Sequence, residues 1–440
     1  MKILICAVNR EKFPDPVFPI GAAYIAGAVK KAGFDVNIFD ACFLDDPLTA
    51  IAECLKKEKP DVIGISIRNI DNTVFPETEN YIHYYKDFIK TCRQHSDAKI
   101  VIGGSGFTVF PELFMKELTP DFGIIGEGEF AFIELLNDLA SGKNRDEKLI
   151  QSNVIKDINF ENFPDREGFD LATYYKYSGA INIQTKRGCA FRCNYCTYPL
   201  IEGYNYRLRD PSVIVDEIEY FHKKGIRHFF FVDSVFNHPE EYAKKICEEI
   251  INRKLRIKWT GFFIPKINDP DFIDVCMRSG LTGVDFGTDA FTETTLKAYD
   301  KFFTVDDIFK AAEICNEKGI KINHSLILGG PGETYKTLNE TIENIEKTNP
   351  TSVIAYIGVR LFPNTPIIND LGQIDFGINP VFYISEHVRD GILEFLQEKV
   401  GSKHNWVVPG LGKGTDLEFL KKLRERGIKG SLLELIQNAR

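Results

Sequence analysis

The stretch that decides the fold lies near the middle of the 440-residue chain and reads Lys186-Arg187-Gly188-Cys189-Ala190-Phe191-Arg192-Cys193-Asn194-Tyr195-Cys196-Thr197-Tyr198-Pro199. It places three thiols, Cys189, Cys193 and Cys196, in a C-x-x-x-C-x-x-C spacing. Residues 180–185, immediately before it, alternate and include β-branched side chains, which predicts a strand. We therefore expect the three thiols to lie on the loop that leaves this strand.

Three thiols on one loop favour an iron–sulfur cluster. A [4Fe–4S] cluster takes four thiolates, so three of them leave one iron open to a small chelating ligand. Gly188 permits the tight backbone approach that such a loop needs. A structural zinc site needs four closed ligands, and the next candidate downstream is only His222. Disulfides are not expected in a chain without a secretion signal, and unliganded core thiols are the remaining alternative.

Length and composition narrow the class of protein. The length allows two to four domains, and 44% hydrophobic residues is enough for large buried cores. No run of about 18 apolar residues or cleavage pattern is present, so we expect a cytoplasmic protein without a membrane span. The net charge of -9, without a Lys/Arg block, disfavours nucleic acid. The seven other cysteines stand singly in apolar patterns, which predicts reduced packing thiols.

Residues 1–150 predict a doubly wound α/β domain. Short apolar runs alternate with amphipathic stretches, as in a parallel sheet covered by helices, and a small-residue helix is expected over 21–33. A ligand of such a sheet lies off the carboxyl ends of its strands. The first strand is not followed by G-x-G-x-x-G, so a dinucleotide is not expected. About five strands are predicted, over residues 2–8, 36–40, 61–67, 99–104 and 122–128.

The rest of the chain divides into three parts. Residues 151–178 are charged and aromatic and predict an interdomain linker. Residues 179–366 again alternate strand and helix signals, which predicts a partial (β/α)6 barrel with its active site at the strand carboxyl ends. Residues 367–440 predict a small, mainly helical cap that selects substrate, with helices at 388–396 and 417–426 and a loop at 405–414. The later barrel strands are expected at residues 228–234, 257–263, 283–289, 320–328 and 352–358.

The cysteine spacing resembles the signature of the radical S-adenosylmethionine (SAM) enzymes, in which SAM chelates the open iron. Residues 1–150 resemble the cobalamin-binding domain that precedes the radical SAM barrel in one branch of that superfamily. The matching residues are Pro19-Ile20-Gly21, the loop 103–108 and Gly126-Glu127-Gly128-Glu129. The resemblance covers about residues 1–366. It implies a [4Fe–4S] cluster held by Cys189, Cys193 and Cys196, together with SAM and cobalamin, as in the class B-type methyltransferases.

The resemblance also implies a cobalamin site. Ordinary strand-to-helix turns are the alternative explanation of its glycines. The D-x-H-x-x-G motif of many cobalamin domains is missing, since residues 1–150 hold only His83 and His95. Arg68 is then expected beneath the corrin, where its positive charge favours cob(I), unless it forms a salt bridge instead. The residues expected to bind cobalamin are Asn9, Arg68, Asn69, Gly103, Gly104, Ser105, Gly106, Thr108, Gly126, Glu127 and Gly128.

A SAM site is implied at the barrel mouth. Asp289 stands where relatives commonly carry Glu, and Arg207 and Arg209 match an R-x-R element that could hold a carboxylate or phosphate. Helix capping and solvated charges are the alternative explanations for Glu333, Thr334 and the two arginines. Tyr195 is expected to flank the cluster and Tyr198 the adenine. The full set of expected SAM contacts is Tyr195, Tyr198, Asp233, Ser234, Asp289, Gly329, Gly330, Pro331, Glu333 and Arg360.

The implied activity moves a methyl group from SAM, via methylcobalamin, to a poorly reactive carbon or phosphorus of a small-molecule or peptide substrate. A second SAM supplies a 5'-deoxyadenosyl radical, and a flavodoxin- or ferredoxin-type protein supplies electrons. Four alternatives stay open. They are ring formation or rearrangement without methyl transfer, polar methylation of an sp2 carbon such as that of indole, a methylthiotransferase, and a non-enzymatic cobalamin sensor or carrier. The methylthiotransferase is disfavoured because neither a second three-Cys cluster nor a basic carboxyl-terminal barrel is found.

Overall fold

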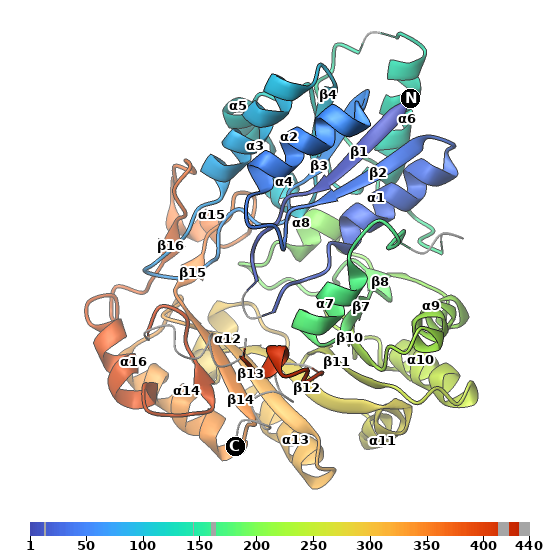
Figure 1. Cartoon of the computed structure of the whole chain (residues 1–440). Coiled ribbons are helices and arrows are strands. Elements are labelled where there is room, and N and C mark those ends of the chain that lie inside the picture. The colour runs from blue at the N-terminus through green and yellow to red at the C-terminus, as the bar shows by residue number, and fades with distance from the viewer. Residues whose placement is uncertain (13–14, 144, 160–163, 412–421, 431–440) are drawn as a thin grey trace.

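The computed structural model describes residues 1–12, 15–143, 145–159, 164–411 and 422–430. Its amino-terminal part is a parallel sheet in the order β2-β1-β3-β4-β5-β6, with helices on both faces (Figure 1). The strand order reverses between β1 and β3, which makes that position the switch point of a flavodoxin-like sheet. The strands are β1 (Lys2–Ala7), β2 (Asp35–Asp40), β3 (Val62–Ser66), β4 (Lys99–Gly103), β5 (Phe122–Ile125) and β6 (Leu149–Gln151).

Both faces of this sheet are buried, which explains why its strands are almost continuously apolar. Leu4 and Cys6 of β1 pack with α2 and α3, whereas Ile3 and Ile5 pack with α1 and α6. The sequence predicted about five strands, and β6 is a sixth that it did not predict. Only three residues of β6 pair with β5, too few for a readable alternation. The helices are α1 (Ile20–Lys31), α2 (Pro47–Glu58), α3 (Ile82–His95), α4 (Ser105–Val109), α5 (Pro111–Leu118) and α6 (Gly128–Ala140).

The second part is an open parallel barrel in the order β17-β14-β13-β12-β11-β10-β7. Six of its strands are arranged across the sheet in the order in which they occur in the chain, as the sequence predicts. They are β7 (Ile181–Ile183), β10 (His228–Phe231), β11 (Lys258–Phe263), β12 (Leu281–Asp289), β13 (Lys321–Leu328) and β14 (Ser352–Ile357). Helices cover the outside: α9 (Pro211–Lys223), α10 (Glu240–Asn252), α11 (Pro270–Ser279), α12 (Glu293–Ala298), α13 (Val305–Glu317) and α14 (Tyr335–Lys347).

The carboxyl-terminal part corrects one prediction. The predicted loop 405–414 contains β17 (Trp406–Val407), which pairs in parallel with β14 and extends the barrel sheet. The helix expected at 388–396 forms later, as α16 (Ile392–Val400), and residues 422–425 of the one expected at 417–426 are helical. Residues 417–421, the first part of the predicted helix, lie outside the described residues, as do residues 160–163 of the predicted linker.

Short elements connect the two parts. Helix α7 (Leu171–Ser178) leads from the first sheet into β7, and the antiparallel pair β8 (Lys186–Arg187) and β9 (Arg207–Leu208) flanks the cysteine loop and α8 (Tyr198–Glu202). A second antiparallel pair, β15 (Val359–Arg360) and β16 (Phe382–Tyr383), follows β14, with α15 (Ile368–Leu371) between them. No helix among the described residues is long and apolar enough to cross a membrane.

Candidate active site between the sheet and the barrel

A cavity of about 840 Å³ lies between the carboxyl ends of the first sheet and the interior of the barrel. All eleven residues expected to bind cobalamin line it. Barrel residues such as Thr260, Asp285 and Asn323 line it from the other side, and Tyr198 lines it from the start of α8. The cavity is therefore shared by the two parts of the chain.

The glycines of the β4 loop are needed for close backbone packing. Gly104 has φ +100°, and a Cβ there would lie 2.5 Å from the carbonyl oxygen of Ile67. A Cβ at Gly106 would lie 2.8 Å from the carbonyl oxygen of Arg68. These contacts lock the loop after β4 against the loop after β3, so side chains larger than hydrogen are excluded there.

Arg68 stands inside the cavity. Its guanidinium donates to Asn69 Oδ1 at 2.9 Å, and no carboxylate of the described residues lies within 4.0 Å of it. The side chain is exposed and lines the cavity, and desolvation by the surrounding protein lowers its pKa. The salt bridge considered as its alternative role is absent from the described residues.

The cavity also contains polar atoms that have no partner. Asn9 Oδ1 and Thr260 Oγ1 are buried cavity-lining atoms that make no hydrogen bond. An unsatisfied buried polar atom is costly, which indicates a ligand or water at both places. A corrin with its amide side chains fits this lining in size and in hydrogen-bonding capacity.

The cysteine loop runs from Gly188 to Thr197. Gly188 has φ +90°, and a Cβ there would lie 2.2 Å from the carbonyl oxygen of Asn205. The amide of Cys189 donates to Gly203 O at 3.1 Å, and that of Cys196 to Cys193 O at 3.1 Å. The backbone of this loop is thus fixed by one hydrogen bond within the loop and one to Gly203.

The three thiols fit a cluster better than a single ion. They are near enough to influence one another electrostatically, yet the described residues hold no group of His, Cys, Asp or Glu compact enough for one metal ion. A cubane cluster places its iron–sulfide core between the thiolates and so needs wider spacing. Burial raises the pKa of Cys196 to about 12 and that of Cys193 as well, so iron binding must displace their protons.

Several expected SAM contacts are instead engaged in fixing the cysteine loop. Both carboxylate oxygens of Asp233 accept hydrogen bonds from Thr185 and the Lys186 amide, and Ser234 Oγ donates to Gly188 O at 2.9 Å. Asp289 accepts from the Tyr195 hydroxyl and forms an ion pair with Lys301. These contacts place the three side chains next to the cysteine loop. Direct SAM binding by Asp233, Ser234 and Asp289 stays a prediction.

The loop after β13 is shaped by Glu333. Its Oε2 accepts the Gly329 amide at 2.7 Å, its Oε1 has no partner, and burial raises its pKa to about 7. A Cβ at Gly330 would overlap the Tyr299 hydroxyl, at 1.8 Å. Thr334 is the N-cap of α14, the alternative that the sequence left open. Pro331 belongs to the same turn, and none of these residues reaches the cavity.

Arg360 connects the barrel to the first sheet. Its Nε and Nη2 lie 3.0 and 2.8 Å from Asp71 Oδ2, and the guanidinium faces the Phe362 ring at 4.7 Å. Arg360, which was expected to contact SAM, instead forms an ion pair between the two domains. Sequence reasoning did not find this role, because Asp71 is distant in sequence and carries no motif.

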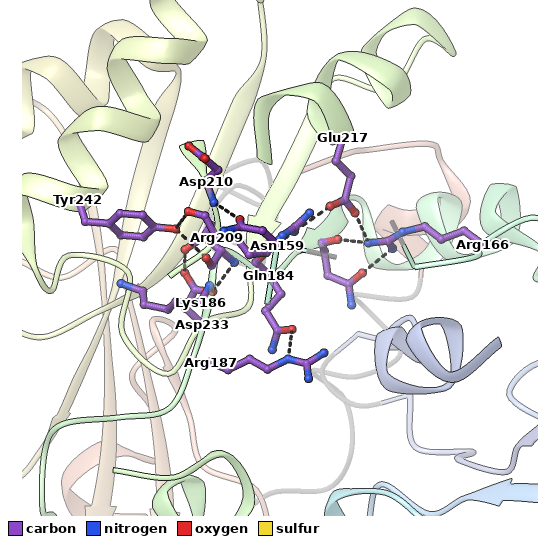
Figure 2. A network of polar contacts seen from close by, with 12 residues as sticks. Asn159, Arg166, Gln184, Lys186, Arg187, Arg209, Asp210, Glu217, Asp233 and Tyr242 are labelled. Atoms are coloured by element: carbon purple, nitrogen blue, oxygen red, sulfur yellow. Dashed lines mark hydrogen bonds and ion pairs between the residues drawn. The ribbon is translucent and has the colours of Figure 1, made fainter. Parts of the chain in front are cut away.

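The R-x-R element likewise holds carboxylates of the chain itself. Arg207 pairs with Glu127 at 2.7 Å, and Arg209 pairs with Glu217 at 2.9 Å. Arg187, just before the cysteine loop, pairs with Glu129 of α6 at 2.6 Å. Figure 2 shows the buried network that continues through Gln184, Glu217 and Arg166. Charged contacts therefore tie the cobalamin-type loops to the cysteine loop.

The fold and this site define a class of protein. The family model described as "B12 binding domain" matches residues 7–136, and the one described as "Radical SAM superfamily" matches residues 183–345. The chain thus carries a B12-binding domain followed by a radical SAM domain, the arrangement of cobalamin-dependent radical SAM enzymes, and these domains imply cobalamin, SAM and a [4Fe–4S] cluster as its cofactors.

Known proteins resemble the chain over most of its length. The tryptophan 2-C-methyltransferase of Streptomyces laurentii is 22% identical, with 86% of this chain and 76% of that protein covered. The anaerobic magnesium-protoporphyrin IX monomethyl ester cyclase of Rubrivivax gelatinosus is 26% identical, with 76% and 62% covered. The solved structure of the methyltransferase TsrM from Kitasatospora setae, with cobalamin and a [4Fe–4S] cluster bound, has a TM-score of 0.88 at 22% identity and covers 100% of this chain and 99% of that one. This likeness confirms the fold.

Proposed function

We propose that the protein is a cobalamin-dependent radical SAM methyltransferase that acts on a poorly reactive carbon, or on phosphorus, of a small-molecule or peptide substrate. The observation that carries the proposal is the shared cavity. It is lined by all the expected cobalamin residues, by Tyr198 next to the cysteine loop and by the barrel interior. A methyl carrier and a substrate held in one shared cavity would satisfy the proximity that group transfer needs.

When bound, cobalamin would supply the methyl group and the cluster with SAM would supply one-electron chemistry. The chain's own residues position these groups. Gly104 and Gly106 bring together two loop backbones that line the cavity where cobalamin would bind, and Cys189, Cys193 and Cys196, on the loop that precedes α8, would hold the cluster. Glu129, through Arg187, links the two sites, so their separation is set by a buried ion pair.

A second candidate is polar methylation of an sp2 carbon such as that of indole. Arg68 favours it, because a cation without a carboxylate partner in the cavity lining would stabilise the reduced, electron-rich state of cobalt once cobalamin is bound there. The Streptomyces relative acts on tryptophan, which is an indole of this kind. Because another relative is a cyclase, ring formation without methyl transfer is kept as an alternative function.

The test uses the anaerobically reconstituted chain with cobalamin, SAM carrying a deuterated methyl group, a flavodoxin- or ferredoxin-type donor and candidate substrates. Mass spectrometry should detect a product that carries the labelled methyl group. Formation of 5'-deoxyadenosine together with that product indicates the radical route, and the labelled product without it indicates the polar route. A transformed product that lacks label would replace the proposal with the cyclase alternative.

A further inference from the structure

The interior of the barrel has a polar row that the sequence did not single out. Strand register places Asp285 of β12 beside Asn323 of β13, and Asn323 beside Ser352 of β14. All three line the shared cavity. Asp285 lies four residues before the end of β12, so the row is deeper in the barrel than Asp289 and the residues around the cysteine loop.

The carboxylate of Asp285 is held firmly on one side only. Its Oδ1 accepts Asn323 Nδ2 at 2.7 Å and Ser325 Oγ at 2.9 Å, and Ser352 Oγ donates to Asn323 Oδ1 at 2.7 Å. Its Oδ2 accepts no hydrogen bond, and no Lys, Arg or His nitrogen within the described part of the chain lies within 4.0 Å. Burial raises the pKa of Asp285 to about 6, so at neutral pH its negative charge has no partner.

A separate observation points to a ligand on the same inward face of the barrel sheet. Thr260, on β11, is 3% exposed, lines the cavity and leaves its Oγ1 without a partner. The wall next to these polar groups is aromatic, since Phe230 of β10 pairs with Thr260, Phe262 of β11 pairs with Asp285, and both rings line the cavity. The cavity thus offers an aromatic wall beside an uncompensated carboxylate.

We propose that Asp285 binds a protonated amine of the substrate, whose apolar body packs against Phe230 and Phe262. The inference deepens the proposed function by naming a substrate class: aromatic or aliphatic amines with a cationic end. Asn323 and Ser325 keep the carboxylate oriented, and the ammonium group neutralises a charge that the protein leaves unpaired. Thr260 Oγ1 is placed to accept or donate a further hydrogen bond.

Binding to the cobalamin-loaded, cluster-reconstituted chain tests this without turnover. The probes are matched pairs of equal shape, tryptamine with tryptophol and phenethylamine with 2-phenylethanol, titrated anaerobically at pH 7.5. We expect each amine to bind at least about tenfold more tightly than its alcohol, the effect of a hydrogen bond to a charged group. Asp285→Asn should abolish the preference. Glu248→Gln, an exposed charge change on α10, should retain it.

Three results would overturn the inference. They are equal binding of amine and alcohol to the unmodified protein, no measurable binding of either, and a preference that survives Asp285→Asn. A tenfold loss of SAM affinity in Asp285→Asn with an unchanged amine preference would assign Asp285 to the SAM site instead. Because the readout is binding, it stays separate from the proposed function. The amine preference can hold while labelled methyl transfer fails, and the reverse can also occur.

Discussion

The Asp71–Arg360 ion pair should be one of the main contacts that hold the barrel against the first sheet, and Asp71→Asn removes its charge. The two side chains are 1% and 8% exposed, and two guanidinium nitrogens contact one carboxylate oxygen at 2.8 and 3.0 Å. Breaking a buried pair by neutralising one partner costs about 3–5 kcal/mol, because the other charge is left uncompensated. Arg360 retains hydrogen bonds to Leu361 and Val381 carbonyls, so the lower end, about 3 kcal/mol, is expected.

Urea unfolding of the apo chain measures this cost. The melting temperature should fall by about 3 °C. The shift is small because the unfolding entropy, about 2.1 cal/mol/K per residue, is large for a chain of this length, and the shift equals the lost free energy divided by that entropy. A cycle with Arg360→Met and the double variant isolates the pair from losses of packing. The expected coupling energy is about 2–3 kcal/mol. A change below about 0.5 kcal/mol in Asp71→Asn, or simple additivity in the double variant, would refute the reasoning.

Three further predictions concern the cluster, the corrin loop and Glu333. Cys193→Ala should lose cluster iron and turnover but keep cobalamin affinity, measured by metal content and equilibrium binding; loss of cobalamin affinity as well would contradict independent sites. Gly104→Ala should lower the unfolding free energy by more than about 2 kcal/mol and weaken cobalamin binding. Gly142→Ala is the control, because Gly142 also has a positive φ but nothing lies near its Cβ, so only backbone strain is expected. Equal effects of the two variants would exclude a clash between the Cβ at residue 104 and Ile67. Burial raises the pKa of Glu333 to about 7, so the folded protein favours its protonated form. As pH rises from 4.5 to about 7, the unfolding free energy of the unmodified protein should therefore fall by up to about 3 kcal/mol. That of Glu333→Gln, which does not titrate, serves as the reference. A pH-independent difference would show that Glu333 titrates normally.

Sequence reasoning predicted the features that depend on local pattern. The six consecutive barrel strands and most of the first sheet were confirmed because their apolar runs are long and separated by clear turn residues. The cobalamin loops were also placed around one cavity, since parallel strands bring their carboxyl ends to the same edge. Strand β17 was missed because two residues, Trp406 and Val407, form no periodic signal and pair only through tertiary contacts.

The partners of charged residues could not be predicted in the same way. Arg360, Arg207 and Arg209 have the residue type that binds an anionic ligand, but their carboxylates come from Asp71, Glu127 and Glu217. Which anion meets an arginine depends on how two domains pack, and the local sequence does not record that. Asp285 could have been found from its place in an alternating strand, where a polar residue at an inward position faces the barrel interior.

The proposed function requires that one chain bind both an iron–sulfur cluster and cobalamin. The most direct measurement is iron and cobalt content per chain, with the visible absorbance spectrum, after anaerobic purification, iron–sulfur reconstitution and addition of hydroxocobalamin. The account predicts about four irons and one cobalt per chain. Iron without cobalt would contradict it, because the eleven residues lining the first-sheet side of the cavity would then serve another ligand and the methyl-transfer proposal would fall.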